Sequence, residues 1–423
     1  MACWRITFAL AAMSVVFALS ACGDDGGTAP QTPAVSGTPP LTIPATASRT
    51  GTATPELPEN LGLFLVDPLT SAVDRVTGGL YGPILGGFLS PEGRLLALRG
   101  DPKGLDVLTV ATGERVRVFD RGVEAVSWSP DSSQLAIYEF DRGLFIANGD
   151  GSGYRKILER GDAPYWAPNG DQIAVVRDVR PQRTPTDDAT DFELLLLNAR
   201  TGARAIYPLG NARFGRGSGI GSPIWSPSGD RVALIPDHRG VPPELVVVTR
   251  GRSLSRIQLD GVPAGYAPFL AWSPDEQNIV FTVYGADETS RIFIVPADGS
   301  ARAKLLAEGG APLWSHDGDQ IAFIGNVCNP DEPDRGFDLM IINGDGSGLR
   351  TIGPTEREIL EAAWSPTDDR IAFRTVTAIH TIRSDGSGLR RVMEWDDVVN
   401  SLGWMPDGKR LWFQSIGGFD LCL

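Results

Sequence analysis

Hydrophobic and polar positions along this chain alternate in short runs that are separated by tight-turn sequences. The clearest unit runs from Val126 to Ile137, where a tryptophan, a Ser-Pro turn sequence and an apolar run follow one another. Ser at position i, Pro at i+1 and Gly at i+3 are the preferences of a type I turn. A strand that ends in an aromatic residue, this turn and a second apolar strand together predict a β-hairpin.

The same unit recurs through most of the chain. Seven copies begin at a tryptophan and an eighth, degenerate copy begins at Phe88, at a spacing of 38 to 59 residues. Four-stranded repeats of about 40–45 residues are typical of β-propellers. We expect the aromatic residue of each copy to pack one blade against the next rather than to bind a ligand. The seven tryptophans are Trp128, Trp166, Trp225, Trp272, Trp314, Trp364 and Trp404.

Each tryptophan hairpin (strands a and b) is followed by a second hairpin (strands c and d) whose turn contains a Gly, as in Asp150-Gly151-Ser152-Gly153. One c–d hairpin, 61–77, stands at the N-terminus, and the last a–b hairpin, 400–415, stands near the C-terminus. Because an open edge strand invites unwanted pairing, we predict that these two hairpins pair and close the ring. The predicted fold is all-β, a single propeller of eight four-stranded blades over residues 61–423. Seven blades are the alternative, because 419–423 could supply a competing strand.

This repeat resembles the TolB-type, WD-repeat-like propeller repeat, whose consensus is close to W-S-P-D-G-x-x-I-A-F followed by D-G-S. The resemblance covers roughly residues 61–423 and implies the propeller fold. It does not specify a function, because such blades also occur in surface lipoproteins, sensor ectodomains and the propellers of peptidases. TolB itself carries an α/β domain ahead of its propeller, and this chain has a different segment there.

The N-terminal 60 residues predict export and a membrane anchor. Residues 1–21 combine Arg5 with a short apolar stretch, as in a signal peptide. The run Leu19-Ser20-Ala21-Cys22 resembles the bacterial lipobox, in which the cysteine is diacylated and becomes the mature N-terminus. Residues 22–60 are nearly all Gly, Thr, Ala, Pro and Ser, which predicts a disordered tether with ends about 33 Å apart. The expected location is a bacterial membrane, on its periplasmic or cell-surface side.

Composition and charge exclude some function classes. The net charge is −14 and no basic patch for phosphates is evident, so we expect no nucleic-acid partner. Of the four cysteines, Cys328 and Cys422 fall in the predicted propeller. They could pair after export, where disulfides persist, or remain free thiols.

The residue patterns of enzymes and metal sites are missing from the sequence. The three histidines, His238, His316 and His380, are not at zinc-binding spacing, and no Gly-x-Ser-x-Gly nucleophile elbow occurs. The Asp-Gly-Ser-Gly turns lack the later Glu of a calcium loop and predict tight turns. We therefore predict no catalytic residue, no metal and no cofactor.

One asymmetry carries functional information. The a–b and c–d turns lie on one face of a propeller and are all short here, whereas the long segments are b–c connections (177–191, 236–243, 284–290, 325–337) and d–a connections (77–86, 208–222, 259–267). Long loops on a rigid scaffold commonly bind partners, and Arg with aromatic residues is typical of binding hot spots. Plain solvated loops are the alternative. The candidate ligand-binding residues are Arg180, Arg183, Arg213, Phe214, Arg216, Arg239, Tyr266 and Tyr284.

Three functions remain open at this point. The first is a lipid-anchored, monomeric binding or scaffold protein that presents its loop face to a protein, peptide or glycan at the cell envelope, with the lipid at Cys22 as its membrane contact. The second is an envelope enzyme, a propeller hydrolase or lyase with a site at the channel mouth. The third is a purely structural envelope protein. The missing His, metal and nucleophile patterns favour the first.

Overall fold

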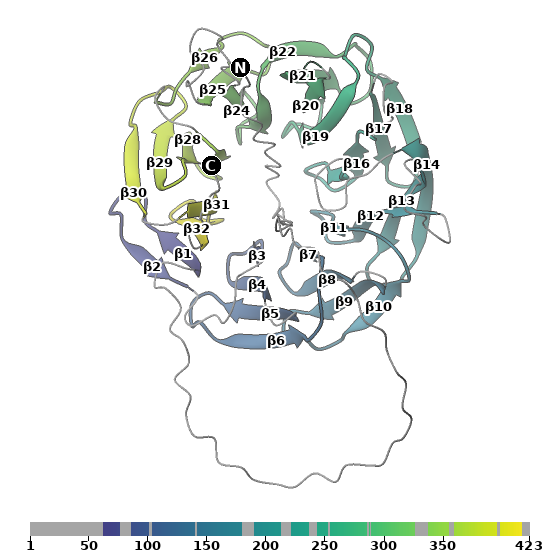
Figure 1. Cartoon of the computed structure of the whole chain (residues 1–423). Helices are drawn as coiled ribbons and strands as arrows, with labels where there is room; N and C mark the ends of the chain where they lie inside the picture. The colour runs from purple at the N-terminus through teal and green to yellow at the C-terminus, as the bar shows by residue number, and fades with distance from the viewer. Residues whose placement is uncertain are drawn as a thin grey trace, which may run out of the picture.

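The chain folds into a ring of eight four-stranded antiparallel sheets around a central axis (Figure 1). The computed structural model describes residues 62–76, 86–100, 104–139, 142–179, 190–212, 221–236, 243–252, 254–285, 287, 289–325, 337–354, 359–395 and 398–416. Each sheet is one blade, and its strands run from a at the axis to d at the rim. The predicted all-β propeller of eight blades is confirmed, and the seven-bladed alternative is wrong.

The described strands, named from a to d in each blade, have the following bounds. Blade 1 comprises β3 (Gly86–Leu89), β4 (Leu95–Gly100), β5 (Gly104–Thr109) and β6 (Arg115–Phe119), and blade 2 comprises β7 (Ala125–Trp128), β8 (Gln134–Glu139), β9 (Gly143–Asn148) and β10 (Arg155–Leu158). Blade 3 comprises β11 (Tyr165–Trp166), β12 (Gln172–Asp178), β13 (Thr190–Asn198) and β14 (Arg204–Ala212), and blade 4 comprises β15 (Ile224–Trp225), β16 (Arg231–Leu234), β17 (Glu244–Thr249) and β18 (Leu254–Gln258). Blade 5 comprises β19 (Gly265–Trp272), β20 (Asn278–Gly285), β21 (Ser290–Pro296) and β22 (Lys304–Glu308), and blade 6 comprises β23 (Gly310–Trp314), β24 (Gln320–Gly325), β25 (Asp338–Asn343) and β26 (Arg350–Thr351). Blade 7 comprises β27 (Glu361–Trp364), β28 (Arg370–Arg374), β29 (Ala378–Arg383) and β30 (Arg390–Glu394), and blade 8 comprises β31 (Val398–Trp404), β32 (Leu411–Ile416), β1 (Gly62–Val66) and β2 (Val73–Arg75).

The ring closes in blade 8, where strands from the two ends of the chain share one sheet. β1 pairs antiparallel with β32, in a register that sets Phe64 opposite Phe413. The phenyl rings of Phe64 and Phe413 stack at a centroid distance of 5.1 Å, and Trp395 packs edge-on against both. The predicted pairing of the N-terminal c–d hairpin with the C-terminal a–b hairpin is therefore confirmed.

The Ser-Pro motif forms the predicted hairpin turn. In blade 2 the carbonyl of Ser129 accepts a hydrogen bond from the Ser132 amide at 2.9 Å, and the Ser129 hydroxyl accepts one from the Gln134 amide at 2.9 Å. The fourth turn residue has a positive φ, 58° at Ser132 and 76° at Gly229. Glycine suits this position because it adopts positive φ without steric cost. A Cβ at Gly229 would in addition lie 2.7 Å from Nδ2 of the Asn169 side chain.

The motif tryptophans link neighbouring blades through their indole N–H groups. Trp272 donates to the carbonyl of Ile224, the residue before the motif tryptophan of blade 4, at 3.2 Å. Five other motif tryptophans donate to the equivalent carbonyl of the preceding blade. The exception is Trp166, which donates to Gly170 in its own turn. The expectation that these residues pack one blade against the next is confirmed.

A second set of contacts between blades lies at the rim, where the first residue of strand d is often a cation. Lys304 donates to the carbonyl of Asp345 in the next blade at 2.7 Å, and Arg350 donates to that of Ser384 at 2.9 Å. Arg155 does the same to Ala199. These side chains satisfy carbonyl groups of the next c–d turn, so the rim is fixed as well as the centre.

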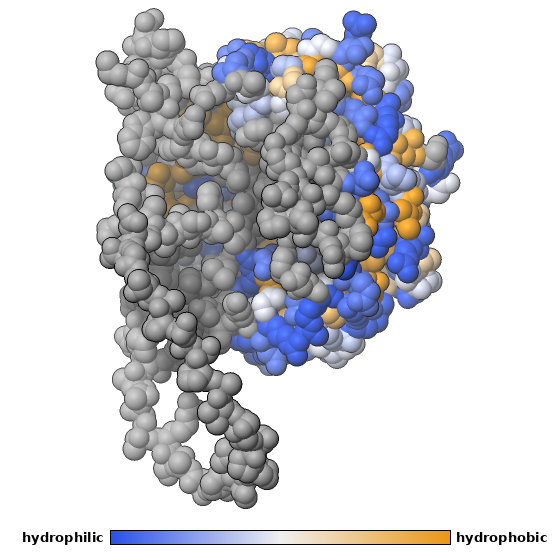
Figure 2. Space-filling view, turned by 45° about the vertical axis from the view of Figure 1, so that its right-hand side comes forward, coloured by the Kyte–Doolittle hydropathy of each residue, from blue (hydrophilic) through white to orange (hydrophobic). Residues whose placement is uncertain are grey.

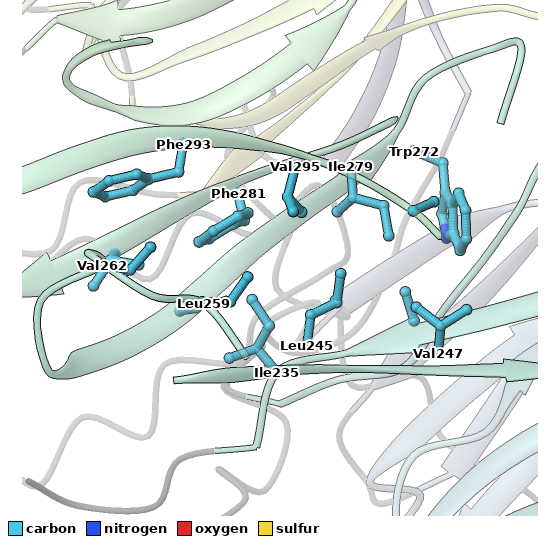
Figure 3. Close-up of a cluster of buried hydrophobic side chains, with 14 residues drawn as sticks. Ile235, Leu245, Val247, Leu259, Val262, Trp272, Ile279, Phe281, Phe293 and Val295 are labelled. Carbon is cyan, nitrogen blue, oxygen red and sulfur yellow. The ribbon is translucent and has the colours of Figure 1, made fainter. Parts of the chain in front are cut away.

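The hydrophobic core lies between the blades, because each sheet buries both faces against its neighbours. Figure 3 shows the interface of blades 4 and 5, where Leu245 and Val247 face Phe281 and Val295 with Trp272 at one end. Sheets that are covered on both faces require nearly continuous apolar strands, and β17 (ELVVVT) has this composition. The blades thus form a rigid scaffold for the connections on either face.

Candidate functional site

The two faces of the propeller differ in how the strands are connected. The short-turn face carries the a–b and c–d turns, and the loop face carries the b–c and d–a connections. Six of the predicted ligand-binding residues belong to loop-face segments outside the described residues. These are Arg180 and Arg183 (180–189), Arg213, Phe214 and Arg216 (213–220), and Arg239 (237–242).

The described part of blade 3 shows where two of these segments leave the scaffold. β13 and β14 are nine residues long, longer than the c and d strands of the other blades. The Val179 amide donates to the Asp191 carbonyl at 3.0 Å, and Thr190 is paired with Ala212. Segment 180–189 therefore begins and ends beside the point where 213–220 begins. We call this end of β12, β13 and β14, residues 177–179, 190–192 and 210–212, the crown of blade 3.

The charges at the crown are more balanced than the sequence suggested. Arg177, predicted to lie in a loop, is part of β12 and forms an ion pair with Glu193 of β13. Asp178 and Asp191 add carboxylates at the same end, and Val179 exposes 45% of its surface. The crown alone is therefore not cationic, and any positive patch there depends on the four arginines of the two segments.

Tyr266 and Tyr284 were predicted to be loop residues, and this prediction is wrong. Tyr266 belongs to β19 and Tyr284 to β20, where they are directly paired. The Tyr284 hydroxyl lies beside Gly310 of blade 6, where a Cβ would come within 3.4 Å of it. The strands of blade 5 are longer than the hydrophobic pattern indicated because cross-strand pairing continues through these tyrosines. The structure thus pairs the two residues along the backbone, and Tyr284 is part of the seam between blades 5 and 6.

A polar group that sequence reasoning missed lies near the axis between blades 3 and 4. The Tyr165 hydroxyl donates to the Ser222 hydroxyl oxygen at 2.8 Å, and burial raises the pKa of Tyr165, which keeps it a donor. The inner strands β11 and β15 contain only two residues each, and each follows a proline, Pro164 or Pro223. Proline cannot donate to a sheet, so these strands begin late. The Pro at this position is the signal that could have indicated the shortened inner strands.

The Asp-Gly-Ser-Gly turns are closed by their own hydrogen bonds. In blade 2 the Asp150 carboxylate accepts hydrogen bonds from the hydroxyl of Ser152 at 2.6 Å and from its amide at 2.8 Å. The hydroxyl bond is the main cause of the lowered pKa of Asp150. Gly151 and Gly153 both have positive φ, as a tight turn requires. The tight-turn interpretation is confirmed.

Within the described ranges, no group of three or more His, Cys, Asp or Glu side chains is placed to hold a metal ion. His380 is buried in β29 and stacks on Phe373 with a ring-centroid distance of 5.0 Å. His238, Cys22, Cys328 and Cys422 lie outside the described residues. That the chain binds no cofactor and that Cys22 carries a lipid stay predictions, and whether Cys328 and Cys422 pair stays open. No helix in the described part of the chain is long and apolar enough to span a bilayer.

Comparison with known proteins supports the fold and no finer assignment. Neither a protein-family model nor a curated protein matches the chain. An oligogalacturonate lyase from Vibrio parahaemolyticus is similar at 14% identity and a TM-score of 0.50, over 75% of this chain and 94% of the lyase. A eukaryotic initiation factor matches at 12% identity and a TM-score of 0.53, over 83% and 88%. A putative TolB from Agrobacterium tumefaciens matches at 16% identity and a TM-score of 0.38, over 63% and 94%. The two matches with TM-scores of 0.50 and 0.53 support the β-propeller fold, and at identities this low they support nothing finer.

Proposed function

We propose that this chain is a lipid-anchored binding protein of the bacterial cell envelope whose loop face, around the crown of blade 3, holds a protein, peptide or glycan ligand. The observation that supports this most directly is the crown itself. Two long segments that together carry Arg180, Arg183, Arg213, Phe214 and Arg216 leave a rigid sheet at adjacent points, marked by the Thr190–Ala212 pair. Loops that are held on a rigid scaffold and carry Arg and aromatic residues are typical of binding surfaces.

The short-turn face offers less for this role. Its a–b and c–d turns are closed by their own hydrogen bonds, as in the Ser129 and Asp150 turns. Their backbone groups are therefore already satisfied, whereas at the crown three strands end beside the starting points of two long segments. The likeness to a lyase is one of fold and supplies no substrate.

The loop face is tested by charge reversal. We expect Arg213→Glu with Arg216→Glu to weaken, by about tenfold, the binding of a ligand found by thermal-shift screening against envelope-derived peptides and glycans, because it removes two cations from one connection. Calorimetric titration of the purified chain measures the change. Melting temperature should not change, since neither residue belongs to a described strand.

The matched control is Arg302→Glu with Lys409→Glu, two exposed residues of the short-turn face. This control should bind the screened ligand like the wild type. Equal weakening in both variants would show a general effect of net charge and would remove the loop face from the proposal.

The anchor is tested separately. We expect mass spectrometry of the membrane fraction to find diacylglycerol on Cys22 at the mature N-terminus, because of the Leu19-Ser20-Ala21-Cys22 sequence and the tether that follows it. The Cys22→Ala variant should leave the membrane fraction. An unmodified N-terminus in the wild type would contradict the anchor and would leave the binding face untouched.

A further inference from the structure

The c–d turns of blades 3 and 4 differ from those of the other six blades in charge. Their sequences, NARTGA and TRGR, contain arginine and no acidic residue. Each of the other six c–d turns contains or adjoins a carboxylate: Asp67, Glu114, Asp150, Asp298, Asp345 and Asp385. Two adjacent blades thus present cations at the place where the rest of the ring presents carboxylates.

A continuous set of contacts brings these two turns and the preceding blade together. Arg155 of β10 donates to the Ala199 carbonyl in blade 3, and the Ala199 amide donates to the Asp171 carbonyl at 3.2 Å. The Asp171 carboxylate then pairs with Arg250 of blade 4 at 2.9 Å. We name the resulting surface the arginine corner. Its cations are Arg155, Arg200, Arg204, Arg250 and Arg252.

Most of the positive charge of the arginine corner is not neutralised. Among the described residues, the side chains of Arg200, Arg204 and Arg252 are exposed and make no ion pair or hydrogen bond. Arg155 binds a carbonyl, which carries no net charge. Three carboxylates of the described chain lie near the corner. Asp171 pairs with Arg250, and the backbone carbonyl of Asp230 accepts a hydrogen bond from the Arg250 amide. The third, Asp150, belongs to the c–d turn of blade 2.

Several arginines elsewhere on the short-turn face are paired with carboxylates. There Arg231 pairs with Glu276, Arg370 with Asp368, and Arg383 with Asp369. In a chain of net charge −14, several unpaired arginines on two neighbouring turns are a local exception. Next to them Ile206, two residues after Arg204 on the same face of β14, exposes 46% of its surface. The outer wall in Figure 2, where the right-hand blades of Figure 1 come forward, likewise shows hydrophobic residues among hydrophilic ones.

The arginine corner lies far from the point where the N-terminal segment joins the ring. The segment 1–61 joins the ring at Gly62, which pairs with Ser415 at the loop-face end of blade 8. Blade 8 lies across the ring from blades 3 and 4 (Figure 1). The arginine corner is therefore on the opposite side of the ring and on the opposite face from the start of the tether. With the proposed lipid at Cys22, on which this step rests, the tether therefore leaves the ring at a point remote from the corner.

We propose that the arginine corner is a docking surface for an acidic segment of a second protein, rich in Asp and Glu. Guanidinium groups bind carboxylates through paired hydrogen bonds, and charge-assisted bonds of this kind are stronger than neutral ones. The corner is built of protruding turns on two blades, which suits an extended acidic segment. Ile206 adds apolar contact beside the cations.

The test uses the purified full chain and a fluorescein-labelled hexaglutamate peptide, followed by fluorescence anisotropy at low salt. We expect the triple variant Arg200→Glu, Arg204→Glu and Arg252→Glu to weaken binding of this peptide by at least about tenfold, and added salt to weaken binding to the wild type. The three side chains make no contact that folding requires, so the melting temperature should be preserved. The control with the same change in net charge is Arg302→Glu, Arg391→Glu and Lys409→Glu, and it should bind like the wild type.

Several results would overturn the proposal. One is a wild type that does not bind the peptide, and another is a triple variant that binds as well as the control. If vesicles of phosphatidylglycerol, and not the peptide, require the three arginines, the occupant is a lipid surface instead. If Arg213→Glu with Arg216→Glu abolishes peptide binding and the triple variant does not, the acidic segment docks on the loop face. Binding that persists in Cys22→Ala would show that the surface acts without the anchor, so a failed anchor and a failed docking surface give different results.

Discussion

Deleting residues 62–76, which hold β1 and β2, is expected to cause aggregation and an early melting transition. The deletion removes the outer half of blade 8 and leaves β32 as an open edge strand, which invites pairing between molecules. It also removes Leu63, Phe64, Leu65 and Val66, all nearly fully buried. At about 2 kcal/mol for each buried apolar side chain, the loss is on the order of 8 kcal/mol, which is comparable to the whole stability of a typical domain.

The control is the deletion of 23–58, which shortens the predicted tether and leaves every described strand in place. Calorimetry and light scattering of both variants measure the difference. We expect the control to melt like the wild type. If the two deletions melted at the same temperature, the pairing of β1 with β32 would not be what holds the ring closed.

Replacing Arg374 by Met is expected to cost roughly 3 kcal/mol of unfolding free energy, because it leaves a buried charge without its partner. Arg374 donates to Glu361 Oε2 at 2.8 Å and to the Val399 carbonyl of blade 8 at 2.6 Å. The Glu361 carboxylate also accepts from the Leu402 amide at 3.3 Å. The two side chains are only 7% and 17% exposed, so this pair joins blades 7 and 8 in a largely dry environment.

The pH dependence of this variant has a definite sign. Burial raises the pKa of Glu361 above its usual range, and Arg374 opposes that rise. Without Arg374 the pKa in the folded state rises further, so the folded variant binds a proton at pH values where the unfolded chain does not. By linkage, the stability deficit of Arg374→Met relative to wild type should then shrink as pH falls through the raised pKa of Glu361.

Denaturant titrations at several pH values test this expectation. Adding Glu361→Gln should recover much of the loss, because no unpaired charge then remains in the seam. The control within the same blade is Arg391→Met, since Arg391 and Glu394 form a pair that is 53% and 63% exposed, and exposed pairs contribute at most about 1 kcal/mol. A deficit for Arg374→Met no larger than that of the control would show that the buried pair does not join the blades.

The sequence indicated the blade pattern because the information for it is local. A Ser-Pro turn, as at Ser129, requires a particular order of turn residues, and the positive φ at Gly229 follows from the same short segment. The candidate site was less predictable. Arg177, Tyr266 and Tyr284 were assigned to loops, yet all three lie in strands. Where a strand ends depends on whether its neighbour continues to pair with it, and a hydrophobic pattern does not contain that information.

The sequence by itself determined the repeat, and it predicted the closure of the ring, the packing role of the tryptophans and eight blades with seven as the alternative. Each follows from turn chemistry and from the need to bury two faces and pair every edge. Only the tertiary structure decided which distant residues became neighbours. It placed Val179, Thr190 and Ala212, the described residues that flank segments 180–189 and 213–220, side by side at the crown. It also paired Arg177 with Glu193, and linked Arg155, Ala199, Asp171 and Arg250 across three blades. Such contacts depend on how one blade is set against the next. That arrangement is fixed by the closed ring as a whole and not by any single repeat.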